Sequence, residues 1–190
     1  MINVFVKWIA SLVIICAPIM SLASIPTWQI IPTNSSLTFT ATQNGAPVTG
    51  TFKTFSGEIN FDPNQLSASK VKIIIDVASV SDAYNQLADT LKTSDWFNVK
   101  TFPQAIFQST EFSKTKDGSY ESKGTLAIRD KTLPVMLTFT LEEYSQTHAR
   151  IKGSTMIKRT AFGVGQGEWA DTKAVKDDVQ INFTIVAVKK

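Results

Sequence analysis

The alternation of large apolar side chains with small or polar ones is the feature that most constrains how this chain can fold. It is clearest over residues 104–112, 120–128 and 133–141, where apolar side chains such as Phe107 and Leu126 recur at about every second position. A period of two is that of a β-strand with one face in an apolar interior and the other in water. The alternation therefore predicts antiparallel strands that surround a common interior.

Stretches of the same kind occupy most of the remaining chain. They are residues 25–31, 36–42, 48–59, 71–80, 150–158 and 179–188. Asn44-Gly45 and Asp117-Gly118 mark tight turns, because these residues tolerate positive φ. Residues 81–98 have helical spacing of apolar side chains, with Asp82 as the predicted N-cap. About eight to nine strands with one short helix predict an all-β sandwich or up-and-down barrel, and about eight strands can close around a ligand.

Residues 1–23 are predicted to be a cleavable signal peptide. Lys7 supplies a basic region, residues 8–20 form an uncharged apolar run, and Ser21-Leu22-Ala23 fits a signal peptidase site. The run is short against the ~20 apolar residues of a membrane span and contains Pro18, so cleavage is favoured over an uncleaved anchor. We expect the mature chain, residues 24–190, to form one domain in the periplasm.

The composition argues against several classes of function. The single cysteine, Cys16, lies in the predicted signal, so the mature chain has no thiolate nucleophile and no cysteine metal ligand. The 19 Lys and Arg residues are interspersed with 16 Asp and Glu residues, which gives no support to nucleic acid binding. Asp171, Asp177 and Asp178 lack the spacing of a calcium loop. The glycines of residues 163–167 predict a turn, because no helix pattern follows them as in a phosphate-binding loop.

The single histidine, His148, is the basis of the enzyme alternative, a secreted hydrolase or isomerase acting on a lipid. It is close in sequence to Glu142 and Glu143 and could act as a general base. No placed nucleophile or second titrating partner accompanies it. We therefore predict no catalytic residue, no metal site and a protein that is not an enzyme.

The inward-facing apolar side chains are the candidates for a ligand-binding lumen. Alternation alone fits a filled core as well as a lined cavity. Residues 73–75 and 185–188 are apolar on both faces, which favours a cavity, and their outer faces require cover from another element or a partner subunit, so a homodimer is one prediction. The lumen candidates are Phe39, Phe52, Ile73, Ile75, Phe107, Leu126, Leu137, Phe139, Ile181 and Phe183.

The order and spacing of several motifs resemble the YceI-like family of secreted bacterial proteins. The matching motifs are Trp28 with Ser36-Leu37-Thr38-Phe39, Phe52 with Phe55-Ser56-Gly57, Phe61-Asp62-Pro63, Leu91 to Val99 with Phe102-Pro103 and Phe107, Gly124 to Arg129, Lys131 to Val135, and Arg159 to Gly165. The resemblance implies an extended antiparallel, eight-stranded, lipocalin-like β-barrel and a periplasmic location. It also implies an apolar lumen that holds an isoprenoid lipid, such as a quinone or a polyprenyl phosphate, with no other cofactor.

The polar residues near the mouth of such a lumen would select the headgroup. The candidates are Asp89, Arg129, Arg159 and Trp169, of which the arginines could bind a phosphate. Many relatives carry Arg-Asp and a His where this chain has Leu87, Ala88 and Thr90, which implies a different or uncharged headgroup.

The resemblance also bears on partners. The segment 165–169 resembles a subset of the family found beside membrane cytochromes, which implies a quinone-type ligand and a membrane cytochrome or other envelope partner. The alternative is a dry, filled barrel that acts through its surface on an envelope partner.

Overall fold

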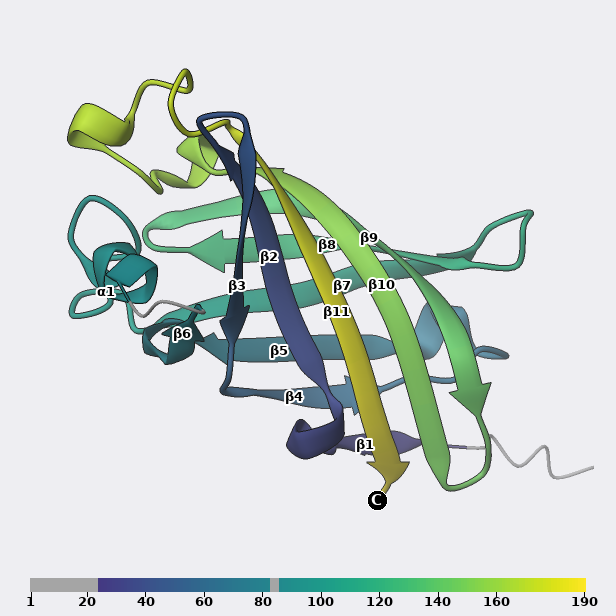
Figure 1. Ribbon diagram of the computed structural model, residues 1–190. Helices are drawn as coiled ribbons and strands as arrows, with labels where there is room; N and C mark the ends of the chain where they lie inside the picture. Colours follow the sequence, from purple (N-terminus) through teal and green to yellow (C-terminus); the bar gives the residue numbers. More distant parts are fainter. Residues whose placement is uncertain (1–23, 83–85) are drawn as a thin grey trace, which may run out of the picture.

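Antiparallel strands dominate the computed structural model, which describes residues 24–82 and 86–190 (Figure 1). The strands are β1 (Thr27–Ile30), β2 (Ser36–Gln43), β3 (Ala46–Phe52), β4 (Phe55–Asn60), β5 (Lys70–Asp76), β6 (Val80–Ser81), β7 (Gln104–Lys114), β8 (Tyr120–Ile128), β9 (Lys131–Tyr144), β10 (His148–Lys158) and β11 (Asp178–Lys189). The α-helix α1 spans Gln86–Lys92, and short 3-10 turns are η1 (Pro32–Asn34), η2 (Leu66–Ala68), η3 (Val77–Ser79), η4 (Thr160–Phe162) and η5 (Gly167–Trp169). The signal peptide predicted over residues 1–23 lies outside the described residues.

Eight of the described strands close into a barrel in the order β1-β4-β5-β7-β8-β9-β10-β11, because β11 pairs back with β1. β2, β3 and β6 extend the wall from β11 at one end. Residues 180–184 of β11 pair with β2, whereas residues 187–189 of the same strand pair with β1. The closed antiparallel barrel with one short helix confirms the predicted fold class.

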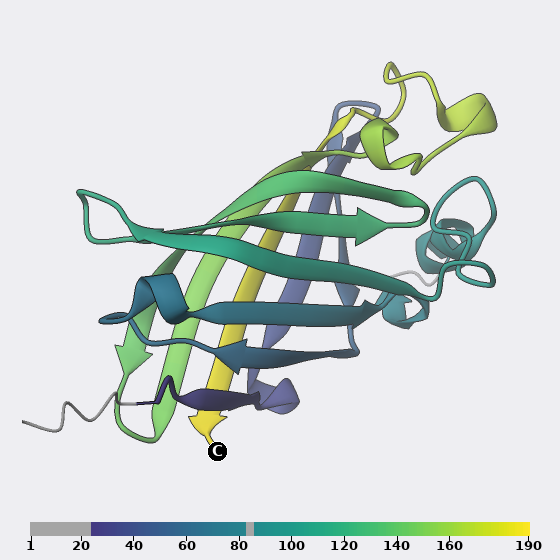
Figure 2. The same cartoon turned by 180° about the vertical axis from the view of Figure 1, so that it is seen from behind.

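The two ends of the barrel differ. α1 and the segment 159–177, which contains η4 and η5, lie at one end, and the β9–β10 hairpin lies at the other (Figures 1 and 2). We call the first the wide end and the second the narrow end. At the wide end, β11 pairs with β2, which in turn pairs with β3. At the narrow end, β11 pairs with the short strand β1.

A cluster of aromatic side chains fills the narrow end. The Phe61 ring centroid lies 5.4 Å from that of Phe112, 6.1 Å from Tyr120 and 5.9 Å from Phe139. The indole Nε1 of Trp28 donates a 2.9 Å hydrogen bond to the Phe61 carbonyl oxygen. Such tilted pairs add about 0.5–1.5 kcal/mol each beyond the burial of their area. This aromatic plug therefore closes the narrow end firmly.

The predicted helix over residues 81–98 is longer than the observed one. Residues 83–85 lie outside the described residues, and α1 ends at Lys92. The Phe97 amide then donates to the Leu91 carbonyl at 2.9 Å, and Asn98 has a φ of 49°, so the chain turns instead of continuing the helix. The Oδ1 of Asp82 accepts a 3.3 Å hydrogen bond from the Ala88 amide, six residues along the chain, whereas an N-cap accepts from an amide two or three residues along. The N-cap role of Asp82 stays a prediction.

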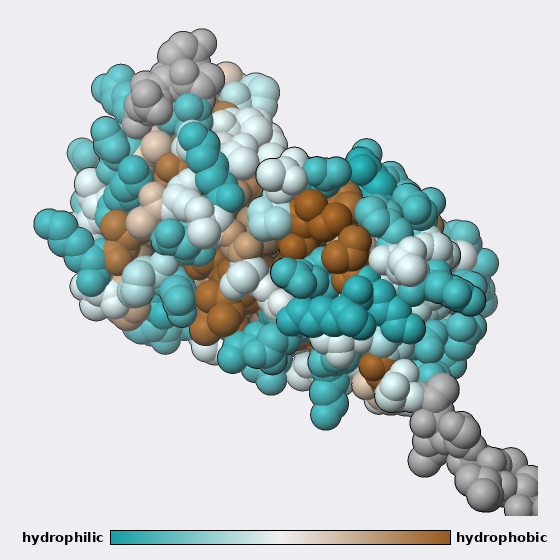
Figure 3. Space-filling model, turned by 90° about the horizontal axis from the view of Figure 1, so that it is seen from below, coloured by the Kyte–Doolittle hydropathy of each residue, from teal (hydrophilic) through white to brown (hydrophobic). Residues whose placement is uncertain are grey.

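The chain itself covers part of the apolar outer face of β11. Val186 is only 2% exposed. The Ile31 amide donates to its carbonyl oxygen at 2.8 Å, and its own amide donates to Ser35 Oγ at 3.0 Å, so the η1 segment lies against the strand here. Elsewhere the surface is mixed: the view from below shows brown hydrophobic patches among teal and white residues (Figure 3).

Candidate functional site

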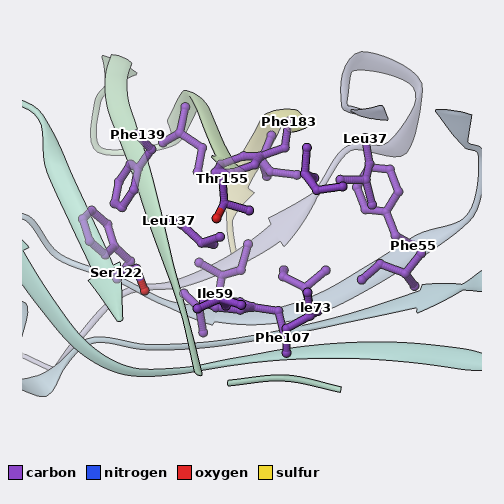
Figure 4. A pocket seen from close by; sticks show the side chains of 18 of the residues that line it. Leu37, Phe55, Ile59, Ile73, Phe107, Ser122, Leu137, Phe139, Thr155 and Phe183 are labelled. Atoms are coloured by element: carbon purple, nitrogen blue, oxygen red, sulfur yellow. The ribbon is translucent and has the colours of Figure 1, made fainter. Parts of the chain in front are cut away.

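The lumen contains an inner chamber of about 200 Å³ that borders the aromatic plug (Figure 4). Side chains from nearly every strand of the barrel line it, among them Phe55, Ile59, Ile73, Phe107, Leu137 and Phe183. None of the lining residues that the structure describes is Lys, Arg, Asp, Glu or His. The chamber can therefore hold an apolar group but offers no partner for an ionised one.

An outer cavity of about 890 Å³ lies at the wide end. α1 contributes Leu87 and Leu91 to its wall, and the segment 159–177 contributes Trp169 and Val175. Three side chains line both spaces, so the two spaces lie next to each other in the barrel: Ile128, Ile157 and Ile181.

Nine of the ten predicted lumen residues line these two spaces. The inner chamber is lined by Ile73, Ile75, Phe107, Leu126, Leu137, Phe139, Ile181 and Phe183. Phe39 lines the outer cavity. Phe52 lines neither; its ring packs between those of Phe39 and Phe97, at centroid distances of 5.7 and 5.8 Å. Contact with a ligand remains a prediction for all ten residues.

Arg159 has a different surrounding from the one predicted for a phosphate-binding mouth residue. Its side chain is 3% exposed. Its guanidinium donates hydrogen bonds of 2.7–3.2 Å to six carbonyl oxygens, those of Val164, Gly165, Trp169, Asp171, Val175 and Lys176. Because these carbonyls engage all of its nitrogens, Arg159 organises the segment 159–177 and has no free donor to offer a phosphate.

Burial lowers the pKa of Arg159, while the negative charge of Asp177 raises it. Asp177 is itself tied to the segment: its Oδ1 accepts hydrogen bonds from the Thr160 amide at 3.0 Å and the Thr160 hydroxyl at 2.8 Å. Burial raises the pKa of Asp177, but the hydrogen bonds from Thr160 and the nearby cations outweigh it and hold that pKa below its usual value. Arg159 and Asp177 therefore both stabilise the wall of the outer cavity.

The other three predicted mouth residues have different surroundings from one another. Arg129, at the β8–β9 turn with a φ of 56°, donates from Nη1 to the carbonyl oxygens of Trp96 at 2.6 Å and Gly163 at 2.7 Å. Asp89 is exposed on α1 and pairs with Lys92 at 3.6 Å. Trp169 lines the outer cavity, and its ring centroid lies 5.6 Å from that of Trp96. Of the four, Arg159 and Trp169 border the lumen.

Three buried side-chain atoms in the described residues lack a hydrogen-bond partner: Trp96 Nε1, Arg129 Nε and Ser122 Oγ. Trp96 lines the outer cavity and Ser122 the inner chamber. Neither Trp96 nor Ser122 was among the predicted site residues. The available signal for Ser122 was a hydroxyl at an inward position of a strand, between Tyr120 and Gly124.

In the part of the chain that the structure describes, no ion pair joins His148 to Glu142 or Glu143. Glu142 forms its ion pair with Arg150, at 2.8 Å from Nε to Oε2. His148 begins β10 at the narrow-end hairpin and lines neither space of the lumen. Within residues 24–82 and 86–190, no three His, Cys, Asp or Glu residues are grouped so as to hold a metal ion. In the same residues, no helix has the length and apolarity to cross a membrane.

Comparison with known proteins gives a consistent relationship. The model of the YceI-like domain matches residues 28–187. A UPF0312 protein of Serratia proteamaculans is 30% identical over 145 residues, which cover 74% of this chain and 73% of the relative. The crystal structure of BcnA from Burkholderia cenocepacia is 34% identical with a TM-score of 0.78, covering 83% of this chain and 98% of BcnA. A polyisoprenoid binding domain from Saccharophagus degradans is 14% identical with a TM-score of 0.71, covering 87% of this chain and 99% of that domain, and shows likeness of fold.

Proposed function

This chain belongs to the YceI-like family, and on that premise we propose that it binds an isoprenoid-type lipid in its lumen as a carrier or scavenger. The observation that carries the proposal is an apolar inner chamber that adjoins a larger cavity at the wide end. Ligand pockets in proteins typically measure about 300–1,000 Å³, a range that the two spaces together reach. The description of the Saccharophagus degradans domain as polyisoprenoid binding adds support by analogy.

The driving force for binding is the burial of hydrocarbon. An isoprenoid chain in water exposes apolar area, and its transfer into the lumen contributes roughly 25 cal/mol per Å² before the ordering of chain and protein is subtracted. The methyl branches of the chain need no hydrogen bonds, so a lining of Phe, Ile, Leu and Val side chains suffices. No chemical step is required, and we propose a binding protein rather than an enzyme.

We place this function in the periplasm. The support is the sequence pattern of residues 1–23, with Lys7 ahead of an apolar run and small residues at positions 21 and 23. A quinone tail and a polyprenyl phosphate are the two candidate ligand types. A homodimer and a membrane cytochrome or other envelope partner stay predictions from the sequence.

The test is to identify what the protein carries. The full chain is expressed in a Gram-negative host, purified from the periplasmic fraction without detergent, and extracted with organic solvent for mass spectrometry. We expect an isoprenoid lipid in near-stoichiometric amount. An empty extract, together with no uptake of an added quinone or polyprenyl phosphate, would refute the proposal and favour a dry barrel that acts through its surface.

Two variants at adjacent positions of β9 link the bound lipid to the lumen. Leu137 lines the inner chamber, whereas the next side chain, Met136, is 49% exposed on the outer face. Leu137→Trp should displace the lipid by occupying the chamber, and Met136→Trp should leave the lipid content unchanged. Far-UV circular dichroism and thermal unfolding of both variants establish that each is folded.

A further inference from the structure

Ser122 is a buried polar group for which the protein supplies no partner. Its residue is 2% exposed, and its Oγ forms no hydrogen bond. The side chain lies on the inward side of β8 and lines the inner chamber (Figure 4). Its cross-strand neighbours are Phe112 on β7 and Leu137 on β9, which have no polar side-chain atoms. An unsatisfied buried hydroxyl is unfavourable, whereas alanine would fill the same place without that penalty.

Water is a poor partner for this hydroxyl. A water molecule held in a cavity needs two to four polar partners, and apolar cavities stay dry. Apart from Ser122, three of the described lining residues have a polar side-chain atom: Trp28, Tyr144 and Thr155. Thr155 donates its hydroxyl to the Met136 carbonyl at 2.9 Å, and the Trp28 indole donates to the Phe61 carbonyl at 2.9 Å. A hydrocarbon molecule with one oxygen atom suits the chamber better than water does, because it fills the apolar space and gives Ser122 a hydrogen-bond partner.

The inner chamber favours uncharged oxygen groups over ionised ones. An ionised phosphate or carboxylate would lose its hydration there without gaining a cation, since no charged side chain is among the lining residues. A serine hydroxyl can donate to a carbonyl oxygen, and it can donate to or accept from an alcohol. The complementary group is therefore an uncharged oxygen, either a hydroxyl or a carbonyl.

We propose that Ser122 is a specificity-determining residue that hydrogen-bonds an uncharged oxygen of the ligand inside the inner chamber. The ligand then lies with its oxygen-bearing end innermost, against the aromatic plug, and its hydrocarbon chain extends through the lumen into the outer cavity. This inference rests on the proposed function, and it narrows the ligand class to isoprenoid alcohols and carbonyl compounds such as quinones.

The test uses probes that share one fifteen-carbon isoprenoid skeleton: farnesene, farnesol, farnesal and farnesyl phosphate. Their dissociation constants are measured on the mature protein and on Ser122→Ala by displacement of N-phenyl-1-naphthylamine, after the affinity of each protein for this fluorophore has been determined. Ser154→Ala is the matched control, because Ser154 lies on β10 but lines neither space of the lumen.

We expect Ser122→Ala to weaken binding of farnesol or farnesal, relative to farnesene, by about three- to tenfold, the worth of one neutral hydrogen bond. The larger loss identifies the preferred group: farnesol indicates a hydroxyl and farnesal a carbonyl. Ser154→Ala should leave these ratios unchanged. The affinity for farnesyl phosphate should not respond to Ser122→Ala, because the ionised end stays outside the chamber.

Three results would overturn the inference. One is an unchanged ratio of oxygenated to hydrocarbon affinities in Ser122→Ala while all probes still bind. The second is a loss of farnesyl phosphate affinity equal to that of farnesol. The third is a fall of several degrees in the melting temperature of ligand-free Ser122→Ala, which would reveal a resident partner for the hydroxyl. If the wild-type protein binds none of the four probes, the proposed function itself fails.

Discussion

Replacement of Arg159 by methionine tests whether this residue organises the wide end of the barrel. Six carbonyl oxygens of the segment 159–177 accept hydrogen bonds from its guanidinium. At about 0.5–1.5 kcal/mol net for each bond, simple addition gives about 3–9 kcal/mol. The substitution also relieves the desolvation of a buried charge, an offset of several kcal/mol, and the carbonyls of a surface segment partly regain water. We therefore expect Arg159→Met to lower the free energy of unfolding by about 2–4 kcal/mol.

The assay is equilibrium unfolding in urea, followed by tryptophan fluorescence. Trp96 and Trp169 are suitable reporters, because their ring centroids are 5.6 Å apart and the Arg159 Cζ lies 5.7 Å from the Trp96 ring centroid. For a domain of this size, the expected loss corresponds to a melting temperature lower by roughly 5–15 °C. Hydrogen exchange should accelerate first in residues 160–176.

Arg150→Met is the matched control. Arg150 forms an exposed ion pair with Glu142, with 46% and 38% of the two side chains exposed, and such pairs contribute about 0–1 kcal/mol. If Arg159→Met destabilises the protein no more than Arg150→Met does, the carbonyl contacts of Arg159 do not stabilise the fold and the reasoning is refuted.

Three further perturbations test other parts of the structure. Gly153→Ala should destabilise the protein by about 1–3 kcal/mol in urea unfolding, because a Cβ there would overlap the Phe183 ring, and wild-type stability would contradict this packing. Phe61→Ala should lower the free energy of unfolding by about 3–5 kcal/mol through loss of the aromatic plug, and a loss below 1 kcal/mol would refute the plug's role. Because the pKa of Asp177 is depressed in the fold, its contribution to stability is present above its unfolded pKa of about 4 and is lost as the pH falls through the folded value. Thr160→Val removes the Thr160 hydroxyl and keeps the amide, so NMR titration should find the pKa of Asp177 raised in this variant, and an unchanged value would exclude the hydroxyl hydrogen bond as a cause.

Much of the barrel could be predicted from local pattern. Strand β8 was predicted with its observed bounds, Tyr120–Ile128, because alternation and the Asp117-Gly118 turn both mark its start. Residues 48–59 were predicted as one strand or more, but the position of the break between β3 and β4 was not predicted, since Lys53 and Thr54 carry no glycine or proline signal. It depends on distant contacts instead: the Lys53 amide donates to the Ser79 carbonyl at 3.2 Å, and the Thr54 amide to Ser79 Oγ at 3.0 Å.

The site was less predictable than the fold, because its polar groups depend on tertiary contacts. Alternation selected eight residues that line the inner chamber, but it could not show whether space remained among them. Arg159 reads in sequence as a surface cation, and only the folded segment 159–177, with positive φ at Gly163 and Gly165, turns carbonyls toward it. Likewise, the unsatisfied hydroxyl of Ser122 follows from the register of β8 against β7 and β9, which no local pattern encodes.

Strand β11 pairs with two different strands along its length, and this allows the two ends of the barrel to change independently during evolution. Residues 180–184 support the β2–β3 hairpin, whereas residues 187–189 hold the seam with β1. Lengthening or shortening that hairpin at its Asn44-Gly45 tip would change the height of the wide-end wall while the β1 seam and the aromatic plug kept their registers. The volume of the lumen and the closure of its narrow end thus depend on different parts of the chain. Evolution can therefore change the size of the ligand that fits without opening the narrow end.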